Sequence, residues 1–145
     1  SILYLKTEGL YLRDIETGSE VKVWDAALDD PISGYENLDL SHNKKLLAWS
    51  DHDSALLAFF TIESWSPFQI ELLTTLPLAA LDGAFSPNDQ YYVSYVYDIT
   101  EEGEFTNPEL YIYDLDTLYE EEFRGEKYLD LSNFDQEFVW ISDWN

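Results

Sequence analysis

Residues 85–95 read Phe-Ser-Pro-Asn-Asp-Gln-Tyr-Tyr-Val-Ser-Tyr, and two related phrases occupy residues 40–49 (LSHNKKLLAW) and 131–140 (LSNFDQEFVW). Each phrase joins an apolar residue and a serine to a short polar turn, and then to a run of apolar residues with the character of a strand. The serines stand at positions 41, 86 and 132, so the phrases recur at steps of 45 and 46 residues. A step of this regularity indicates a repeated structural unit.

A second phrase runs in phase with the first, at residues 10–18 (LYLRDIETG), 58–64 (AFFTIES) and 110–117 (LYIYDLDT). Alternating apolar residues predict a strand in each copy, and the polar cluster after it predicts a turn. A further apolar segment follows at 21–24, 69–73 and, more weakly, 119–123. Each unit therefore contains four antiparallel strands, and this period is typical of β-propeller blades. A β-sandwich with accidental regularity is the alternative, and two motifs in register across three copies disfavour it.

These two motifs resemble those of the WD-like propellers, as found in the Tol-Pal periplasmic protein and in dipeptidyl-peptidase-type enzymes. Those families carry a Ser-Pro-Asp-Gly-Lys turn after the first strand of a blade and a Leu-Tyr-x-x-Asp-x-x-Thr-Gly hairpin before the last. Residues 86–90 (SPNDQ) match the first motif well, residues 41–45 and 132–136 match it in part, and residues 14–18 match the second. The glycine of the first turn is missing from all three copies. The resemblance implies an all-β propeller outside the cytoplasm, periplasmic or extracellular, and implies no activity.

The phase of the repeats predicts one incomplete propeller domain over residues 1–145, with about three blades. The first blade occupies 1–25 with strands near 2–6, 9–15 and 20–24, the second 38–76 and the third 83–123, and a further blade starts over 128–145 with a strand near 128–131. Closed propellers need about four to eight blades. We therefore expect this chain to be part of a larger propeller; two chains joined into a six-bladed ring are the alternative, because association hides open sheet edges.

Composition excludes several classes of protein. Hydrophobic residues make up 46% and aromatic residues 17% of the 145 residues, enough for a packed core and too much for a disordered tail. The chain has no cysteine, which excludes disulfides, thiolate metal sites and cysteine nucleophiles. It also lacks a Gly-x-Ser-x-Gly elbow and the His-x-x-x-His and His-Glu-x-x-His patterns. Its histidines, His42 and His52, fall in expected turns, and we predict no catalytic residue and no enzyme activity for the chain.

The formal charge is −23, from 30 acidic and seven basic residues. Such a surface repels phosphate groups, so we expect neither nucleic-acid binding nor membrane insertion. The excess is concentrated between Asp98 and Glu126, where eleven acidic residues accompany a single basic one. Three interpretations stay open: a solvated, self-repelling surface, adaptation to a salt- or calcium-rich setting, or a docking face for a basic protein partner.

Acidic residues supply the candidate sites for ligands. The connection at 98–108 is longer than its counterpart in the second repeat, and such insertions gather on one rim of a propeller. Its Glu101, Glu102 and Glu104 are candidates for a partner or Ca²⁺, and a flexible hydrophilic hairpin is the alternative. Weaker calcium candidates, at positions where turn chemistry explains aspartate equally well, are Asp51, Asp53, Asp114 and Asp116. Apart from this possible Ca²⁺, we expect no cofactor.

Aromatic residues suggest one further contact. Most of the five tryptophans and eleven tyrosines fall at strand positions, where rings fill the space between blades. Trp65, within Ser-Trp-Ser-Pro, falls instead at a hairpin tip, where an exposed ring is a plausible anchor for a partner.

The sequence thus favours a non-catalytic interaction or scaffold module that binds through a rim of inter-blade loops. Two alternatives stay open. One is the propeller part of a serine peptidase whose catalytic domain lies outside this chain, and the other is a structural subunit of an extracellular assembly.

Overall fold

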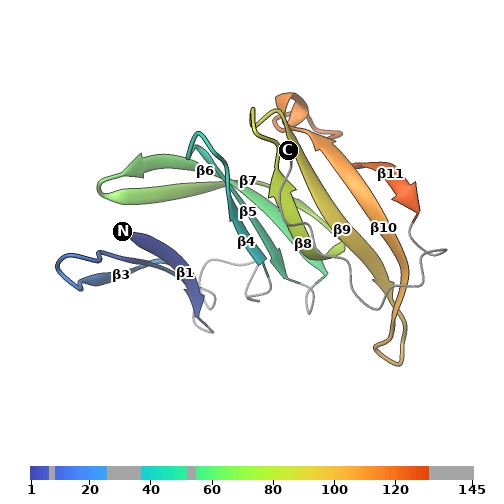
Figure 1. The fold of residues 1–145 in the computed structure, drawn as a ribbon, viewed down its shortest axis with the longest axis horizontal. Coiled ribbons are helices and arrows are strands. Elements are labelled where there is room, and N and C mark those ends of the chain that lie inside the picture. The colour runs from blue at the N-terminus through green and yellow to red at the C-terminus, as the bar shows by residue number, and fades with distance from the viewer. Residues whose placement is uncertain (7–8, 26–36, 52–54, 131–145) are drawn as a thin grey trace.

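The computed structural model describes residues 1–6, 9–25, 37–51 and 55–130 (Figure 1). This part of the chain forms strands and one short 3-10 helix. Their bounds are β1 Ile2–Lys6, β2 Gly9–Arg13, β3 Glu20–Asp25, β4 Asn37–Leu40, β5 Leu46–Asp51, β6 Leu56–Trp65, β7 Phe68–Leu76, β8 Ala79–Phe85, β9 Tyr91–Ile99, β10 Phe105–Asp114, η1 Leu115–Thr117 and β11 Glu126–Asp130.

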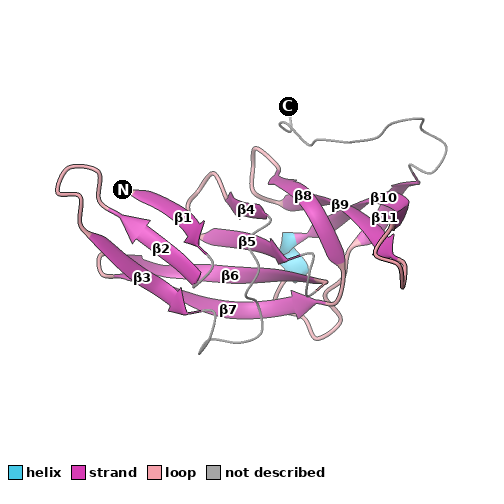
Figure 2. Ribbon diagram, turned by 90° about the horizontal axis from the view of Figure 1, so that it is seen from below, coloured by secondary structure: helices cyan, strands magenta, loops and turns pink. Residues whose placement is uncertain are grey.

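The strands form three antiparallel sheets, ordered β1-β2-β3, β4-β5-β6-β7 and β11-β10-β9-β8. In each sheet, neighbouring strands are also consecutive in the sequence, so every sheet is a simple meander. The sheets follow one another along the long axis of the molecule (Figures 1 and 2). An all-β chain that folds as successive antiparallel units of up to four strands is the architecture of a β-propeller segment, as predicted.

The first two sheets agree closely with the predicted strands. The expected strands at 2–6, 9–15 and 20–24 are β1, β2 and β3, and the second unit spans Asn37 to Leu76. In β5 and β6, every residue from Leu47 to Ser50 and from Leu57 to Phe60 is buried, so these strands are covered on both faces. Strands buried on both faces require neighbours on both sides, and the first and third sheets supply them.

The third sheet differs from the prediction at its outer strand. We expected a strand at 119–123 and the first strand of a further unit at 128–131. Instead β11 pairs with β10, with Leu110 opposite Leu129 and Glu109 opposite Asp130, so the sheet spans residues 79–130 rather than 83–123. The rest of the further unit, including the third serine phrase, lies outside the described residues.

A turn takes the place of the expected strand at 119–123, and of its two apolar residues Phe123 enters the core while Tyr119 is 75% exposed. Asp114 caps η1 by accepting the backbone N–H of Asp116 at 3.1 Å. Leu115, Leu118 and Phe123 are then buried together in the cluster between the second and third sheets. An extended strand places successive side chains on opposite faces, and it would leave part of this set exposed.

The two described serine turns have the same hydrogen bonds, which explains the repeated phrase. The Ser41 hydroxyl accepts the N–H of Leu46 at 2.9 Å, and the Ser86 hydroxyl accepts the N–H of Tyr91 at 2.9 Å. Each serine also donates to the asparagine two residues later, at 2.9 Å from Ser41 and 2.8 Å from Ser86. Side chains that bond nearby backbone groups in this way are what make serine and asparagine turn residues.

The residues that replace the glycine of the turn motif keep the backbone conformation that glycine favours. Lys44 and Asp89 occupy its position in the two turns and have φ values of 59° and 54°. This left-handed region favours glycine, and among other residues asparagine and aspartate tolerate it best.

An inter-sheet contact, which we call the Asp89 clasp, uses this conformation. The Asp89 carboxylate accepts the backbone N–H groups of His42 at 2.8 Å and Asn43 at 2.7 Å. One Asp89 oxygen also lies 3.1 Å from Nδ1 of His42. The side chain of Asp89 is only 5% exposed, so the clasp ties the turn of the second sheet to that of the third in a largely desolvated position. We call the end of the sheets that carries these turns the serine-turn rim, and the opposite end the hairpin rim.

Aromatic rings fill the space between the second and third sheets. The Phe59 ring lies 5.3 Å from that of Tyr92 and 5.5 Å from that of Phe123, edge to face in both cases. The Tyr92 hydroxyl adds a polar contact between these two sheets, because it donates to Asp39 of β4 at 2.7 Å. Edge-to-face pairs of this kind add stability beyond the area that they bury. Trp49 and Phe60 form an equivalent cluster toward the first sheet.

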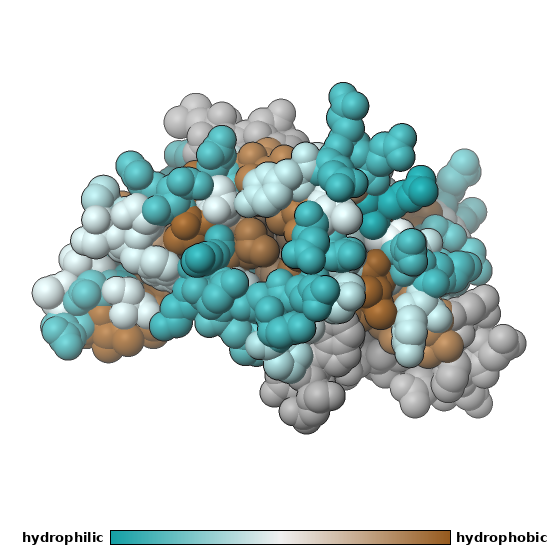
Figure 3. Space-filling view, turned by 90° about the horizontal axis from the view of Figure 1, so that it is seen from above, coloured by the Kyte–Doolittle hydropathy of each residue, from teal (hydrophilic) through white to brown (hydrophobic). Residues whose placement is uncertain are grey.

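The surface is mostly polar around this core. Seen from above in the orientation of Figure 1, hydrophilic side chains cover most of the face, and hydrophobic ones show between them (Figure 3). Within the described residues, no helix is long and apolar enough to cross a membrane.

Candidate functional site

Trp65, predicted as a partner contact, lies at the end of β6 and is 40% exposed. Its indole N–H donates to the carbonyl of Lys44 at 3.1 Å, and its ring packs on Phe68 with centroids 5.0 Å apart. Lys44 belongs to a serine turn, so the tryptophan covers the serine-turn rim of the second sheet. The ring therefore has a local packing role, and its exposed part stays a predicted contact for a partner.

Glu101, Glu102 and Glu104, also predicted as contacts, lie in the hairpin between β9 and β10, with all three residues exposed. The hairpin is closed by hydrogen bonds from the N–H of Thr100 to the Glu104 carbonyl at 2.9 Å and from the N–H of Gly103 to the Thr100 carbonyl at 2.9 Å. The backbone thus holds the three carboxylates outward at one tip. This tip is on the hairpin rim, so the structure does not bring these glutamates together with Trp65.

The weaker calcium candidates are dispersed. Asp51 is buried at the end of β5, Asp114 and Asp116 stand at η1 on the serine-turn rim, and Asp53 lies outside the described residues. Within the described part of the chain, no group of three or more side chains of the metal-binding types comes together to hold an ion. Calcium binding stays a prediction without a site that gathers its ligands. Of the two histidines, His42 is part of the Asp89 clasp, and His52 lies outside the described residues.

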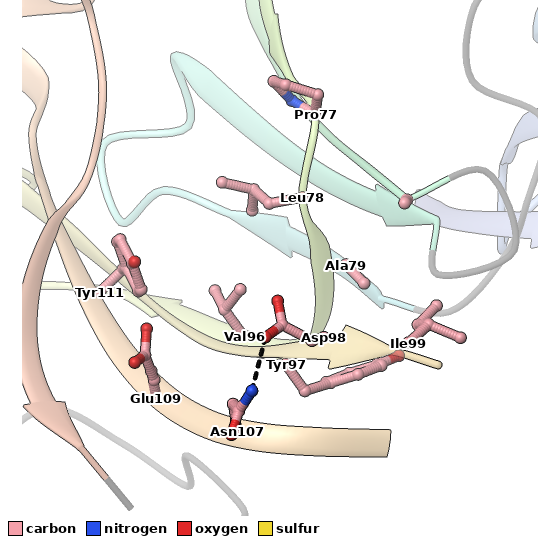
Figure 4. A pocket seen from close by; sticks show the side chains of 11 residues that line it. Pro77, Leu78, Ala79, Val96, Tyr97, Asp98, Ile99, Asn107, Glu109 and Tyr111 are labelled. Carbon is pink, nitrogen blue, oxygen red and sulfur yellow. Dashed lines mark hydrogen bonds between the residues drawn. The ribbon is translucent and has the colours of Figure 1, made fainter. Parts of the chain in front are cut away.

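A pocket of about 440 Å³ opens beside the acidic hairpin, between the second and third sheets (Figure 4). Ala55, just before β6, and Pro77 and Leu78, in the connection between β7 and β8, line one side, and the third sheet contributes the remainder of the lining. In Figure 4, Asp98, Glu109 and Tyr111 rise from the strands toward Leu78. The third-sheet lining residues are Ala79, Val96, Tyr97, Asp98, Ile99, Asn107, Glu109 and Tyr111.

Irregular pairing of β9 with β10 shapes this pocket. The register shifts between Thr106 and Glu109, so Val96 pairs with Glu109 while Asp98 pairs with Thr106. Asn107 lies in the bulge with φ 52°, and its amide donates to the Asp98 carboxylate at 2.8 Å. A bulge of this kind redirects side chains relative to a regular ladder. The antiparallel pairing of the two strands places two acidic side chains, those of Asp98 and Glu109, at one pocket.

The two carboxylates of the pocket have different neighbours. Asp98 bonds the neutral amide of Asn107, whereas Glu109 forms an ion pair with Lys127 of β11. Burial, followed by a hydrogen bond with Glu109, raises the pKa of the Tyr111 hydroxyl. The tyrosine therefore stays neutral and is able to donate. The pocket thus combines apolar walls with a carboxylate whose negative charge is not balanced by Asn107, its hydrogen-bond partner.

Sequence reasoning selected the tip of the acidic hairpin and missed the pocket at its stem. The signal that was present is the length of the 98–108 connection, which marks this rim. Asp98 and Glu109 are eleven positions apart in the sequence, and the antiparallel pairing of β9 with β10 brings both to the same pocket.

Comparison with known proteins places few limits on the chain. No protein-family model matches it, and no curated protein matches it. Among solved structures, it is similar to the crystal structure of TolB from Acinetobacter baumannii, with a TM-score of 0.47 and 15% sequence identity. The similarity covers 82% of this chain and 26% of the TolB chain, so the chain spans about a quarter of that structure's length.

Proposed function

We propose that this chain is a non-catalytic protein-interaction module of a WD-like propeller, and that it binds a basic partner through its hairpin rim. The observation that carries the proposal is the concentration of acidic groups there: three exposed glutamates at the β9–β10 tip lie on the same rim as the carboxylates of Asp98 and Glu109. The turn motifs that resemble those of extracytoplasmic propellers support a periplasmic or extracellular location.

A rim that carries charge of one sign mainly changes the rate at which a charged partner associates with it. A patch of negative charge raises the rate at which a basic partner finds the surface, and salt screens this effect. Exposed charges at an interface edge contribute mainly to the association rate and to its salt dependence. The proposal therefore predicts a rate effect that is specific to the hairpin rim.

The third sheet offers a matched control for this test. The turn after η1 also carries three exposed glutamates, and Leu115 at its start donates its N–H to the carbonyl of Gln90, which places it on the serine-turn rim. Neutralising either set removes the same charge from opposite ends of β10. The two triple variants are E101Q/E102Q/E104Q at the hairpin rim and E120Q/E121Q/E122Q at the serine-turn rim.

The experiment measures the rates at which the chain associates with two sets of immobilised synthetic peptides. The basic set carries arginine and lysine, and the control set carries glutamine at the same positions. We expect the wild-type chain to bind the basic peptides, with a rate that falls as salt rises. The hairpin-rim variant should associate several-fold more slowly and depend less on salt, and the serine-turn variant should resemble the wild type. Equal slowing in both variants would mean that total charge, and not this rim, attracts the peptides.

A further inference from the structure

We propose that the pocket between the second and third sheets is a receptor for one basic side chain, the lysine or arginine of the partner, inserted with its alkyl stem against Leu78 and its charged head toward Asp98. This inference rests on the proposed function and names the contact that would give it specificity. The long acidic hairpin attracts a basic segment, whereas the pocket selects one residue within it.

The shape and lining of the pocket fit such a side chain. Its volume of about 440 Å³ lies within the range of small-ligand pockets. Pro77 and Leu78 form one wall, and Val96 lies on the opposite strand. Lysine and arginine bury their methylene stems along apolar surface while the charged head stays with polar partners. A purely polar ligand would leave these walls unused, and a purely apolar one would desolvate the carboxylates without compensation.

Asp98 is the group that the charged head would reach. The hydrogen bond from Asn107 occupies one oxygen of Asp98, and a carboxylate accepts about four hydrogen bonds in all. Asn107 is neutral, so this bond orients the carboxylate without balancing its charge. A guanidinium or ammonium group would add a charge-assisted hydrogen bond, which is about twice as strong as a neutral one.

Glu109 shows that the pocket already accommodates a cation at its edge. Lys127 reaches Glu109 from β11, where its side chain is 48% exposed while that of Glu109 is 19% exposed. An ammonium group from a neighbouring strand therefore already pairs with one carboxylate of this pocket, that of Glu109. Tyr111, with its pKa raised, adds a neutral hydroxyl beside Glu109. The second cation would bind at Asp98, on the adjacent strand.

The test uses the peptide acetyl-Ala-Arg-Ala-amide and its citrulline analogue, which has nearly the same shape and no charge. Backbone amide shifts of the ¹⁵N-labelled chain are followed at low ionic strength. We expect the arginine peptide to shift the amides of residues 96–99 and 109–111, with saturable binding, and the citrulline peptide to give no saturable shift. The variant Asp98→Asn should raise the dissociation constant roughly tenfold, since a hydrogen bond to a charged group is lost.

The matched control is Glu120→Gln, which removes one exposed charge on the serine-turn rim and should leave the dissociation constant unchanged. Binding of citrulline as tight as that of arginine would overturn the inference, and so would shifts spread over the acidic surface and equally weakened in both variants. If the pocket amides do not shift but association of the basic peptides still depends on the hairpin glutamates, the inference about the pocket is overturned and the proposed function stands. If the pocket amides shift but association of the basic peptides does not depend on the hairpin glutamates, the proposed role of the hairpin is overturned and the pocket still binds basic side chains.

Discussion

Asp39 should make this protein less stable as the pH rises through the weakly acidic range. The residue lies on β4 and points into the junction with the third sheet, where its carboxylate accepts the Tyr92 hydroxyl at 2.7 Å and the Asn37 amide at 2.7 Å. Burial raises the pKa of Asp39 from 3.8 to about 6. The two hydrogen bonds lower this pKa and only partly offset the effect of burial, whereas the nearby charge of Asp82 raises it further. The folded chain therefore binds a proton at Asp39 more tightly than the unfolded chain does.

The sign and size of the effect follow from this difference. A group with a raised pKa in the folded state favours folding fully below its unfolded pKa, and that contribution disappears as the pH rises through the folded pKa. The window here is from about pH 3.8 to about pH 6. A difference of this size corresponds to at most about 3 kcal/mol in the free energy of unfolding. Asp39→Asn is neutral at every pH, and its amide oxygen still accepts the Tyr92 hydroxyl.

We therefore expect Asp39→Asn to be close to the wild type in stability below the window and more stable above it, by up to about 3 kcal/mol. The assay is urea unfolding followed by tryptophan fluorescence across the window, with the difference between variant and wild type as the readout. General repulsion among the acidic residues affects both proteins and largely cancels in this difference. Asp116→Asn, at an exposed position, controls for the loss of one negative charge. A stability difference that does not change with pH, or that falls as the pH rises, would contradict preferential protonation of Asp39 in the folded state.

Substitutions at three further positions test the contacts that join and shape the sheets. Asp89→Ala removes the acceptor for two backbone N–H groups in the clasp and should cost about 2 kcal/mol in urea unfolding; Asp89→Gly, which relieves the left-handed backbone, should cost less. Gly83→Ala would place its Cβ 2.0 Å from the Tyr92 hydroxyl oxygen and 2.4 Å from the ring carbon that bears it, so we expect a loss of several kcal/mol in urea unfolding, and a loss below about 1 kcal/mol would show that the ring moves aside. Ser86→Ala removes the turn hydroxyl and should cost about 1 kcal/mol, whereas an unchanged unfolding midpoint would show that water replaces it.

Much of the fold could be predicted because each serine phrase encodes its turn locally. Ser86 and Asn88 close the turn with their own side chains, so the short sequence determines where one strand ends and the next begins. Alternation along the flanking strands then selects the buried face. These signals need no knowledge of distant residues, and the predicted strands of the first two sheets agree with the observed bounds to within about three residues.

The outer strand of the third sheet could not be predicted in the same way, because its sequence carries the signal of another position. Leu129-Asp130-Leu131-Ser132 repeats Leu38-Asp39-Leu40-Ser41, which begins the second unit. In the structure, residues 126–130 nevertheless pair with β10 as an outer strand, and Tyr128 is 70% exposed there. Backbone pairing with a neighbouring strand does not depend on side-chain identity, so the local pattern could not reveal it.

The candidate pocket could not be predicted either, and its position follows from how the second and third sheets meet. At the serine-turn rim the Asp89 clasp draws the two turns together, and behind it the rings of Phe59 and Tyr92 fill the interface. Toward the hairpin rim, the register shifts between Ala80 and Asp82 on β8 and again in β10, and the aromatic filling gives way to the pocket. Two sheets held tightly at one end and irregular at the other form a wedge. The position of the pocket therefore depends both on the Asp89 clasp at one rim and on the register shifts at the other. Residues from four strands determine it together.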